Sequence, residues 1–167
     1  MPILDHLEPQ AVFSYFEQLC AIPHGSGNTK EISDHLVLFA AEHHLRCIQD
    51  AHNNIVIFSP GTPGYESAAP VILQGHMDMV CEKNSDVEFD FDRDPIRTRI
   101  DGGWVRAEGT TLGADCGIGM AAALAVLIDP SVEHGPVEAL FTVDEETGLT
   151  GAFELGEDML TGKYLVN

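Results

Sequence analysis

Two apolar runs, VILQG at residues 71–75 and VEALFTV at 137–143, constrain the fold of this chain more than any other feature. The first run is apolar almost throughout rather than alternating, which is typical of a strand that is buried on both faces of a sheet. It therefore predicts a central strand. The second run, apolar at five of its seven positions, predicts another buried strand.

The remaining periodicity predicts helices and shorter strands around these two runs. Apolar residues at helical spacing predict a helix after Pro9, a second helix from Asn28, where NTKE has the form of a capping box, and a small-residue helix over 117–128. Short β-rich runs predict further strands at RCIQ, IVIF and YLV, and an exposed hairpin formed by IRTRI and WVRA. This alternation predicts an α/β fold: a layered, largely parallel sheet with helices on both faces.

Composition limits the function classes that this chain can serve. Its 167 residues, 44% of them hydrophobic, are enough for one substantial core and one globular unit. The 27 acidic and 8 basic side chains give a formal charge of −19, which repels phosphate backbones and anionic lipids and attracts divalent cations. We expect no nucleic-acid or membrane partner, and the absence of a leader-like start or a long apolar run favours a cytoplasmic protein.

The four cysteines are predicted to be unpaired. They are widely spaced and form no CxxC pair, which argues against a zinc knuckle or a thioredoxin-type site. A core of this size does not need disulfides for stability. We therefore expect free thiols at Cys20, Cys47, Cys81 and Cys116.

Acidic and imidazole side chains follow the predicted strands. His76 and Asp78 come directly after the first apolar run, the acidic residues 144–146 follow the second, and Asp115 lies just before the small-residue helix. In α/β sheets, functional groups gather beyond the carboxyl ends of the strands. Three adjacent carboxylates repel one another, so a fold that gathers them usually supplies a cation. The alternative, a solvated acidic loop, leaves the nearby His76 and Asp78 unexplained.

These residue types suit a two-metal hydrolase. Imidazole and carboxylate ligands bind Zn²⁺, Co²⁺ or Mn²⁺, and a carboxylate such as Asp115 can bridge two ions. A ligating histidine commonly donates its second N–H to a carboxylate, which is the role that Asp78 can play for His76. Of the adjacent Glu145 and Glu146, one can bind metal while the other accepts a proton from the attacking water.

The M20 metallopeptidases resemble this chain in three motifs that occur in the same order: GHMDMVCEK, TLGADCGIGMAAALA and ALFTVDEETGLTGA. The similarity is strongest to the cytosolic Xaa-His dipeptidases and covers nearly the whole chain. The resemblance implies that His76 ligates one zinc, Asp115 bridges both zincs, Glu146 ligates the second, Glu145 is the general base and Asp78 orients His76. It also implies hydrolysis of short peptides, Xaa-His dipeptides such as carnosine among them, and a homodimeric full-length enzyme.

The chain departs from the family pattern in its ligand count. The resemblance implies a further aspartate shortly after KYLVN and a histidine far down the chain, whereas the sequence stops at Asn167. We therefore expect residues 1–167 to be the amino-terminal part of a catalytic domain, inactive when isolated, without the lid or dimerisation domain. None of the other histidines has the strand-end context of a replacement ligand: His6, His24, His35, His43, His44, His52 and His134.

Two other functions stay open. Another M20 hydrolase, such as a tripeptidase or an N-acyl amino acid deacylase, would keep the same five site residues and differ in its substrate pocket. A non-catalytic α/β module that binds metal or a partner would have lost the remaining ligands. IPHGSGN at residues 22–28 also matches these dipeptidases, and we interpret it as a lead-in to the helix capped by Asn28 rather than as a substrate contact.

Overall fold

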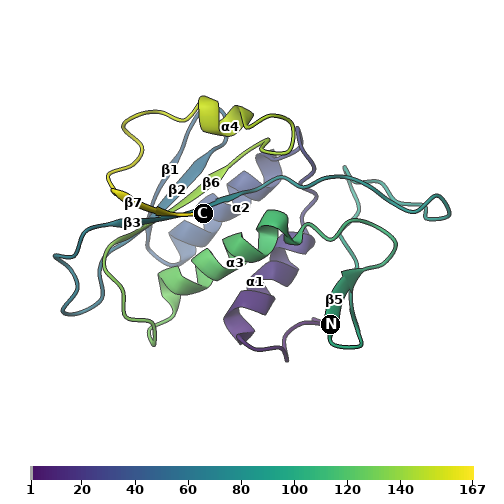
Figure 1. The fold of residues 1–167 in the computed structure, drawn as a ribbon, viewed down its shortest axis with the longest axis horizontal. Coiled ribbons are helices and arrows are strands. Elements are labelled where there is room, and N and C mark those ends of the chain that lie inside the picture. The colour runs from purple at the N-terminus through teal and green to yellow at the C-terminus, as the bar shows by residue number, and fades with distance from the viewer. Residues whose placement is uncertain (1) are drawn as a thin grey trace.

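A five-stranded sheet forms the centre of the computed structural model, which describes residues 2–167 (Figure 1). Its strand order is β1-β2-β6-β3-β7. The bounds are β1 Arg46–Gln49, β2 Ile55–Ser59, β3 Val71–His76, β6 Val137–Thr142 and β7 Tyr164–Val166. All six residues of β6 are buried, and β3 lies beside β6. The two apolar runs are therefore inner strands, as the sequence predicts, and the structure shows that they are neighbours.

Three long helices cover one face of the sheet: α1 Gln10–Cys20, α2 Lys30–Glu42 and α3 Ala114–Ile128. Figure 1 shows them on the side opposite the one-turn helix α4, Thr150–Phe153. The main core lies between these helices and the sheet, where Leu36 and Leu124 pack with Ile57 and Phe141. A smaller apolar cluster on the other face contains Val56, Ile72, Leu140 and Met159. The layered α/β class is thus confirmed.

The sheet is mixed, not largely parallel as expected. The pairs β1–β2 and β2–β6 are antiparallel, and only β3–β6 and β3–β7 are parallel. The short turn over residues 50–54 explains the first pair, because a few residues suffice for a hairpin while a parallel pair needs a long crossover. The expected helices on both faces are also only partly present, because the second face is covered by α4 and the loop that carries Leu155, Met159 and Leu160.

Local chain geometry corrects one predicted helix start and confirms another. The expected capping box at Asn28 does not form, because α2 begins at Lys30 and its N-cap, Thr29, makes no side-chain capping bond. The backbone N–H of Asn28 instead donates to the carbonyl of Gly25 at 2.8 Å. In α3, Asp115 and Cys116 have non-helical φ/ψ angles, so the regular helix begins near Gly117, as predicted.

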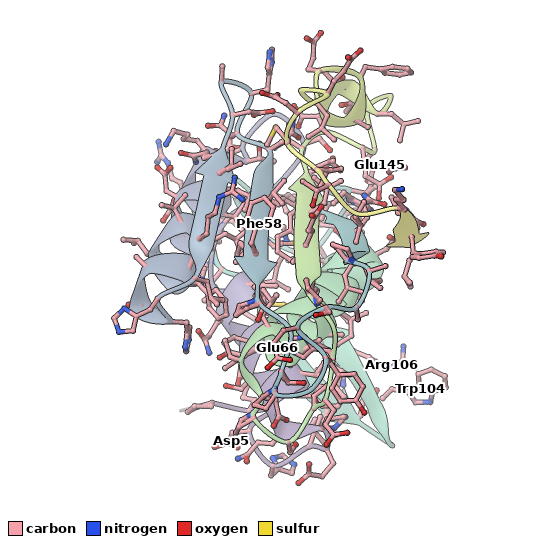
Figure 2. All side chains as sticks on the ribbon, turned by 90° about the vertical axis from the view of Figure 1, so that its left-hand side faces the viewer. Asp5, Phe58, Glu66, Trp104, Arg106 and Glu145 are labelled. Carbon is pink, nitrogen blue, oxygen red and sulfur yellow. The ribbon has the colours of Figure 1, made fainter. Side chains whose placement is uncertain are left out.

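The predicted hairpin lies apart from the main sheet. It consists of β4, Thr98–Asp101, and β5, Trp104–Ala107, paired antiparallel. Gly102 and Gly103 have φ angles of 57° and 89°, which glycine adopts without strain. Figure 2 shows Trp104 and Arg106 on this hairpin, away from the strands of the main sheet.

The four cysteines are free thiols, as expected. Across residues 2–167, no helix has the length and apolar character needed to cross a membrane.

The buried carboxylate of Glu138 fixes the position of the loop that leads into the last strand, β7. Glu138 in β6 is 3% exposed and accepts hydrogen bonds from the backbone N–H groups of Thr161 and Gly162 at 2.9 and 3.1 Å, and from the hydroxyl of Thr161. A buried carboxylate needs donors of this kind to offset its lost hydration. The loop before β7 is therefore fixed against β6, and β7 pairs in parallel with residues 71–73, the first half of β3.

Candidate metal centre

The parallel pairing of β3 and β6 brings two polar loops together. His76 at the end of β3 is the register partner of Thr142 at the end of β6, and the N–H of Met77 donates to the Thr142 carbonyl at 2.8 Å. Both strands therefore finish at the same edge of the sheet. Figure 2 labels Glu145 at this end and Glu66 toward the opposite end. His76 and Asp78 thus lie beside residues 144–146, as the strand ends predict.

Asp115 reaches the same edge from the start of α3. Gly113 has a φ of 72°, a conformation that favours glycine, and a Cβ at this position would lie 2.9 Å from the sulfur of Met79. Asp115 itself is extended, with φ −89° and ψ 111°, instead of helical. Its carboxylate oxygen Oδ1 lies 3.1 Å from Nε2 of His76. The glycine-rich segment therefore presents Asp115 to the histidine.

His76 and Asp78 form an oriented pair. Nδ1 of His76 lies 3.0 Å from the backbone carbonyl of Asp78 and 3.3 Å from its carboxylate oxygen Oδ1. With Nδ1 held in this way, Nε2 faces Asp115 and lies 3.9 Å from Oε2 of Glu145. A ligating histidine needs this arrangement, in which one ring nitrogen is fixed by an acceptor and the other is left for a metal.

The carboxylate of Asp78 also holds the loop that carries the two glutamates. Its Oδ1 accepts the backbone N–H of Glu145 at 2.9 Å, and its Oδ2 accepts that of Glu146 at 3.2 Å. Potential ligand atoms of His76, Glu145 and Glu146 lie within 4.8 Å of one another. This spacing and the imidazole and carboxylate donors fit a borderline metal such as Zn²⁺. All five predicted site residues therefore meet at one edge of the sheet.

Three residues near the cluster differ in their surroundings. Asp144 is half-buried and accepts the backbone N–H of Gly27 at 2.7 Å, whereas Glu82 is exposed. Cys116, read from the sequence as an ordinary thiol, lies with its sulfur among the potential ligand atoms of His76 and Asp115. In the sequence, only the adjacency of Cys116 to Asp115 could have indicated this contact.

A cleft of about 470 Å³ opens beside the cluster. His76, Asp115 and Glu145 form its polar part, and Leu149 and Leu165 form part of its apolar wall. A volume of this order holds a small ligand. The cleft therefore places apolar surface next to the groups that can bind metal.

Hydrogen bonding shifts the protonation of the histidine pair. Burial alone lowers the pKa of His76, but its hydrogen bonds with the carboxylates of Asp78 and Asp115 outweigh burial and raise that pKa to about 9. Burial alone raises the pKa of Asp78, while hydrogen bonds from His76, Ser26 and the backbone lower it to about 2. In the metal-free protein, His76 is therefore positive and its partner Asp78 is ionised at neutral pH.

We expect metal binding to release a proton from His76. The folded pKa lies above the ordinary value of 6.5, so the charged ring stabilises the metal-free fold fully below pH 6.5, and this contribution is lost as pH rises through about 9. A metal must displace this proton, so the apparent metal affinity should rise about tenfold per pH unit between pH 7 and 9. Calorimetric zinc titration at pH 7.5 in buffers of different ionisation enthalpy measures the release. Binding without proton release would contradict the assigned protonation.

The fold and the cluster define an α/β domain whose polar groups lie at the carboxyl ends of the inner strands. Residues 72–166 match the family described as Peptidase family M20/M25/M40, and the chain belongs to this family. The family prediction made from the three motifs is confirmed.

Three relatives illustrate the similarity. The cytosol non-specific dipeptidase of Escherichia coli is 47% identical over 167 residues, which are 100% of this chain and 34% of the relative. A crystal structure of an aminoacylhistidine dipeptidase from Vibrio alginolyticus is 46% identical with a TM-score of 0.94, covering 97% of this chain and 33% of that one. A tripeptidase from Staphylococcus aureus is 25% identical with a TM-score of 0.77, covering 95% and 43%. The chain thus spans about a third of the length of the first two of these proteins.

Proposed function

We propose that this chain is the amino-terminal part of the catalytic domain of a zinc dipeptidase. The observation that carries the proposal is the convergence of His76, Asp115, Glu145 and Glu146 at one edge of the sheet. Two relatives of 46–47% identity are named as dipeptidases and are about three times as long, which supports both the activity and the partial length. The remaining ligands, the lid and the dimer contacts would belong to the rest of a longer, homodimeric protein.

The site residues would include metal ligands and a residue that orients one of them. His76 would hold one zinc through Nε2, Asp115 would bridge two zincs, and Glu146 would hold the second. Co²⁺ or Mn²⁺ could replace zinc, because the donors are imidazole and carboxylate groups without a soft thiolate requirement. Asp78 is not a ligand in this assignment, since its carboxylate is 1% exposed and occupied by backbone donors. Its role is to orient His76.

The reaction would be the addition of water to a peptide carbonyl. Bound zinc would supply Lewis acidity at the carbonyl and a lower pKa for the attacking water. Glu145, whose carboxylate borders the cleft, would accept the proton of that water and deliver it to the leaving amine. The carboxylate of Asp78 accepts the backbone N–H of Glu145 at 2.9 Å and also contacts Nδ1 of His76. One side chain therefore positions both the general base and the histidine. The peptide would lie in the cleft, against Leu149 and Leu165.

The substrate would be a dipeptide in the cytosol. One relative is named as a non-specific dipeptidase and another as an aminoacylhistidine dipeptidase, so both names fit cleavage of two-residue peptides and differ in the second residue. We propose that Xaa-His dipeptides such as carnosine are among the substrates. The printed name of the Escherichia coli relative, a cytosol enzyme, supports the cytoplasmic location.

A substrate panel tests this proposal. The complete protein would be assayed with apolar dipeptides, Xaa-His dipeptides, tripeptides and N-acyl amino acids, each with and without a chelator. We expect chelator-sensitive hydrolysis of dipeptides and little hydrolysis of the last two classes. Preferred cleavage of tripeptides or N-acyl amino acids would assign a different M20 activity. No hydrolysis, with a gene that ends at Asn167, would support a non-catalytic module.

A further inference from the structure

One short segment contacts every loop that carries a residue of the candidate metal centre. We call residues 24–28 the strap. The carbonyl of His24 accepts the N–H of Met79 at 3.1 Å, next to Asp78. The N–H of Gly27 donates to the carboxylate of Asp144 at 2.7 Å. The ring of His24 lies beside Gly113, where a Cβ would be 3.3 Å from Nε2.

The strap is held against the chain after β3 by its backbone. Gly25 forms a parallel bridge with Met79, and the N–H of Ser26 lies 3.4 Å from the Met79 carbonyl. A Cβ on Gly25 would lie 2.4 Å from the sulfur of Cys81, so a larger residue here would require the Cys81 side chain to shift. His24 is 4% exposed, and its Nδ1 lies 2.6 Å from the carbonyl of Ile22. These contacts fix the direction in which Ser26 projects.

Ser26 projects toward the buried carboxylate of Asp78. Its hydroxyl donates to Oδ2 at 2.7 Å, the shortest of the hydrogen bonds that this carboxylate accepts. The other donors are Nδ1 of His76 and the backbone N–H groups of Glu145 and Glu146. Because a carboxylate is rigid and planar, the donor on Oδ2 also sets how Oδ1 faces His76. The hydroxyl is therefore bonded to the carboxylate that holds His76 and the two glutamate amides, and Ser26 is not among the residues that line the cleft.

We propose that Ser26 is a positioning residue of the metal centre, acting through Asp78 on His76 and on the backbone of Glu145 and Glu146. The inference rests on the proposed function, since it assumes that these residues bind metal. It assigns to the IPHGSGN stretch a role that is neither a helix lead-in nor a substrate contact. Polar groups that orient metal ligands typically change metal affinity by about 10 to 100-fold when they are removed.

Ser26→Ala in the complete protein tests the inference. We expect zinc affinity, measured by competition with a chelating dye, to fall by about tenfold or more. With zinc in excess, kcat should fall while KM changes by less than about twofold, because the substrate does not touch the hydroxyl. In the metal-free protein, hydrogen exchange of the amides of Glu145 and Glu146 should become faster. Ser26→Thr keeps the donor and should retain most of the affinity and the slow exchange.

Ser33→Ala is the matched control. Ser33 is buried in α2, and its hydroxyl donates to the carbonyl of Asn53 at 2.8 Å and accepts from the side chain of Gln49. Its loss should lower the melting temperature without changing zinc affinity or the exchange of the glutamate amides. Should Ser26→Ala prove insoluble, Ser26→Cys, a weaker donor of similar size, should show an intermediate loss.

Two results would overturn the inference in distinguishable ways. A wild-type protein that binds zinc and cleaves dipeptides, combined with Ser26→Ala of unchanged zinc affinity and amide exchange, would remove the role of Ser26 alone. A wild-type protein that binds no zinc would remove the proposed function and this inference with it.

Discussion

Replacing Glu145 by glutamine is expected to abolish turnover while leaving the zinc content unchanged. The amide keeps the volume of the side chain but cannot accept the proton of the attacking water, so kcat should fall by at least about a hundredfold. Glu146→Gln should instead weaken one metal site, because an amide oxygen is an uncharged and poorer ligand than a carboxylate. Activity of this second variant should recover in part with excess zinc. Steady-state kinetics and elemental analysis of both variants give the comparison.

The control for this pair is Glu154→Gln. Glu154 is exposed in the loop after α4, where its Oε2 lies 3.6 Å from Nε2 of His52. Its replacement should change neither the turnover nor the zinc content. The two glutamate variants must differ in metal content for the assignment to hold. Loss of zinc from Glu145→Gln together with retention in Glu146→Gln would reverse the roles. Equal activity losses with normal zinc content in both would contradict any division of labour between them.

Asp115→Asn is expected to have the largest effect on metal binding. A carboxylate can bridge two ions with its two oxygens, whereas an amide presents a single neutral oxygen. The complete protein should therefore lose at least one of two zincs, and turnover should fall by about a thousandfold, corresponding to several kcal/mol of lost electrostatic stabilisation. Elemental analysis after gel filtration and dipeptide hydrolysis measure the two effects.

Asp129→Asn is the matched control, because Asp129 is the C-cap at the other end of the same helix. Its carboxylate accepts hydrogen bonds from the backbone and hydroxyl of Ser131 at the surface. This variant should keep both zincs and full turnover. If Asp115→Asn also keeps two zincs, Asp115 does not bridge, and the assignment of the centre fails.

Much of the site follows from the sequence for one physical reason. His76 and the acidic residues 144–146 each follow a buried apolar run, and two parallel strands finish at the same edge of a sheet. For Asp115, the sequence indicates only that it lies in a glycine-rich segment at the start of a helix. The structure adds why it faces His76, since Gly113 has a positive φ and Asp115 is extended instead of helical.

What the sequence could not provide are the contacts between distant segments. Ser26 and Asp78 are 52 positions apart, and no periodicity links a serine in a loop to a carboxylate after a strand. The antiparallel half of the sheet was missed for a similar reason, because strand patterns indicate burial and not the direction of the partner. The capping box at Asn28 failed because that residue's N–H is used by the turn to Gly25.

Zinc content coupled to activity tests the central claim most directly, namely that the ends of the inner strands form the metal centre of a dipeptidase. The complete protein would be purified, analysed for bound metal, stripped with a chelator and reloaded with known amounts of zinc while dipeptide hydrolysis is followed. We predict about two zincs per chain, loss of hydrolysis on stripping and its return as zinc is restored. Full hydrolysis by the stripped protein, or a protein that retains no metal after gel filtration, would contradict the account.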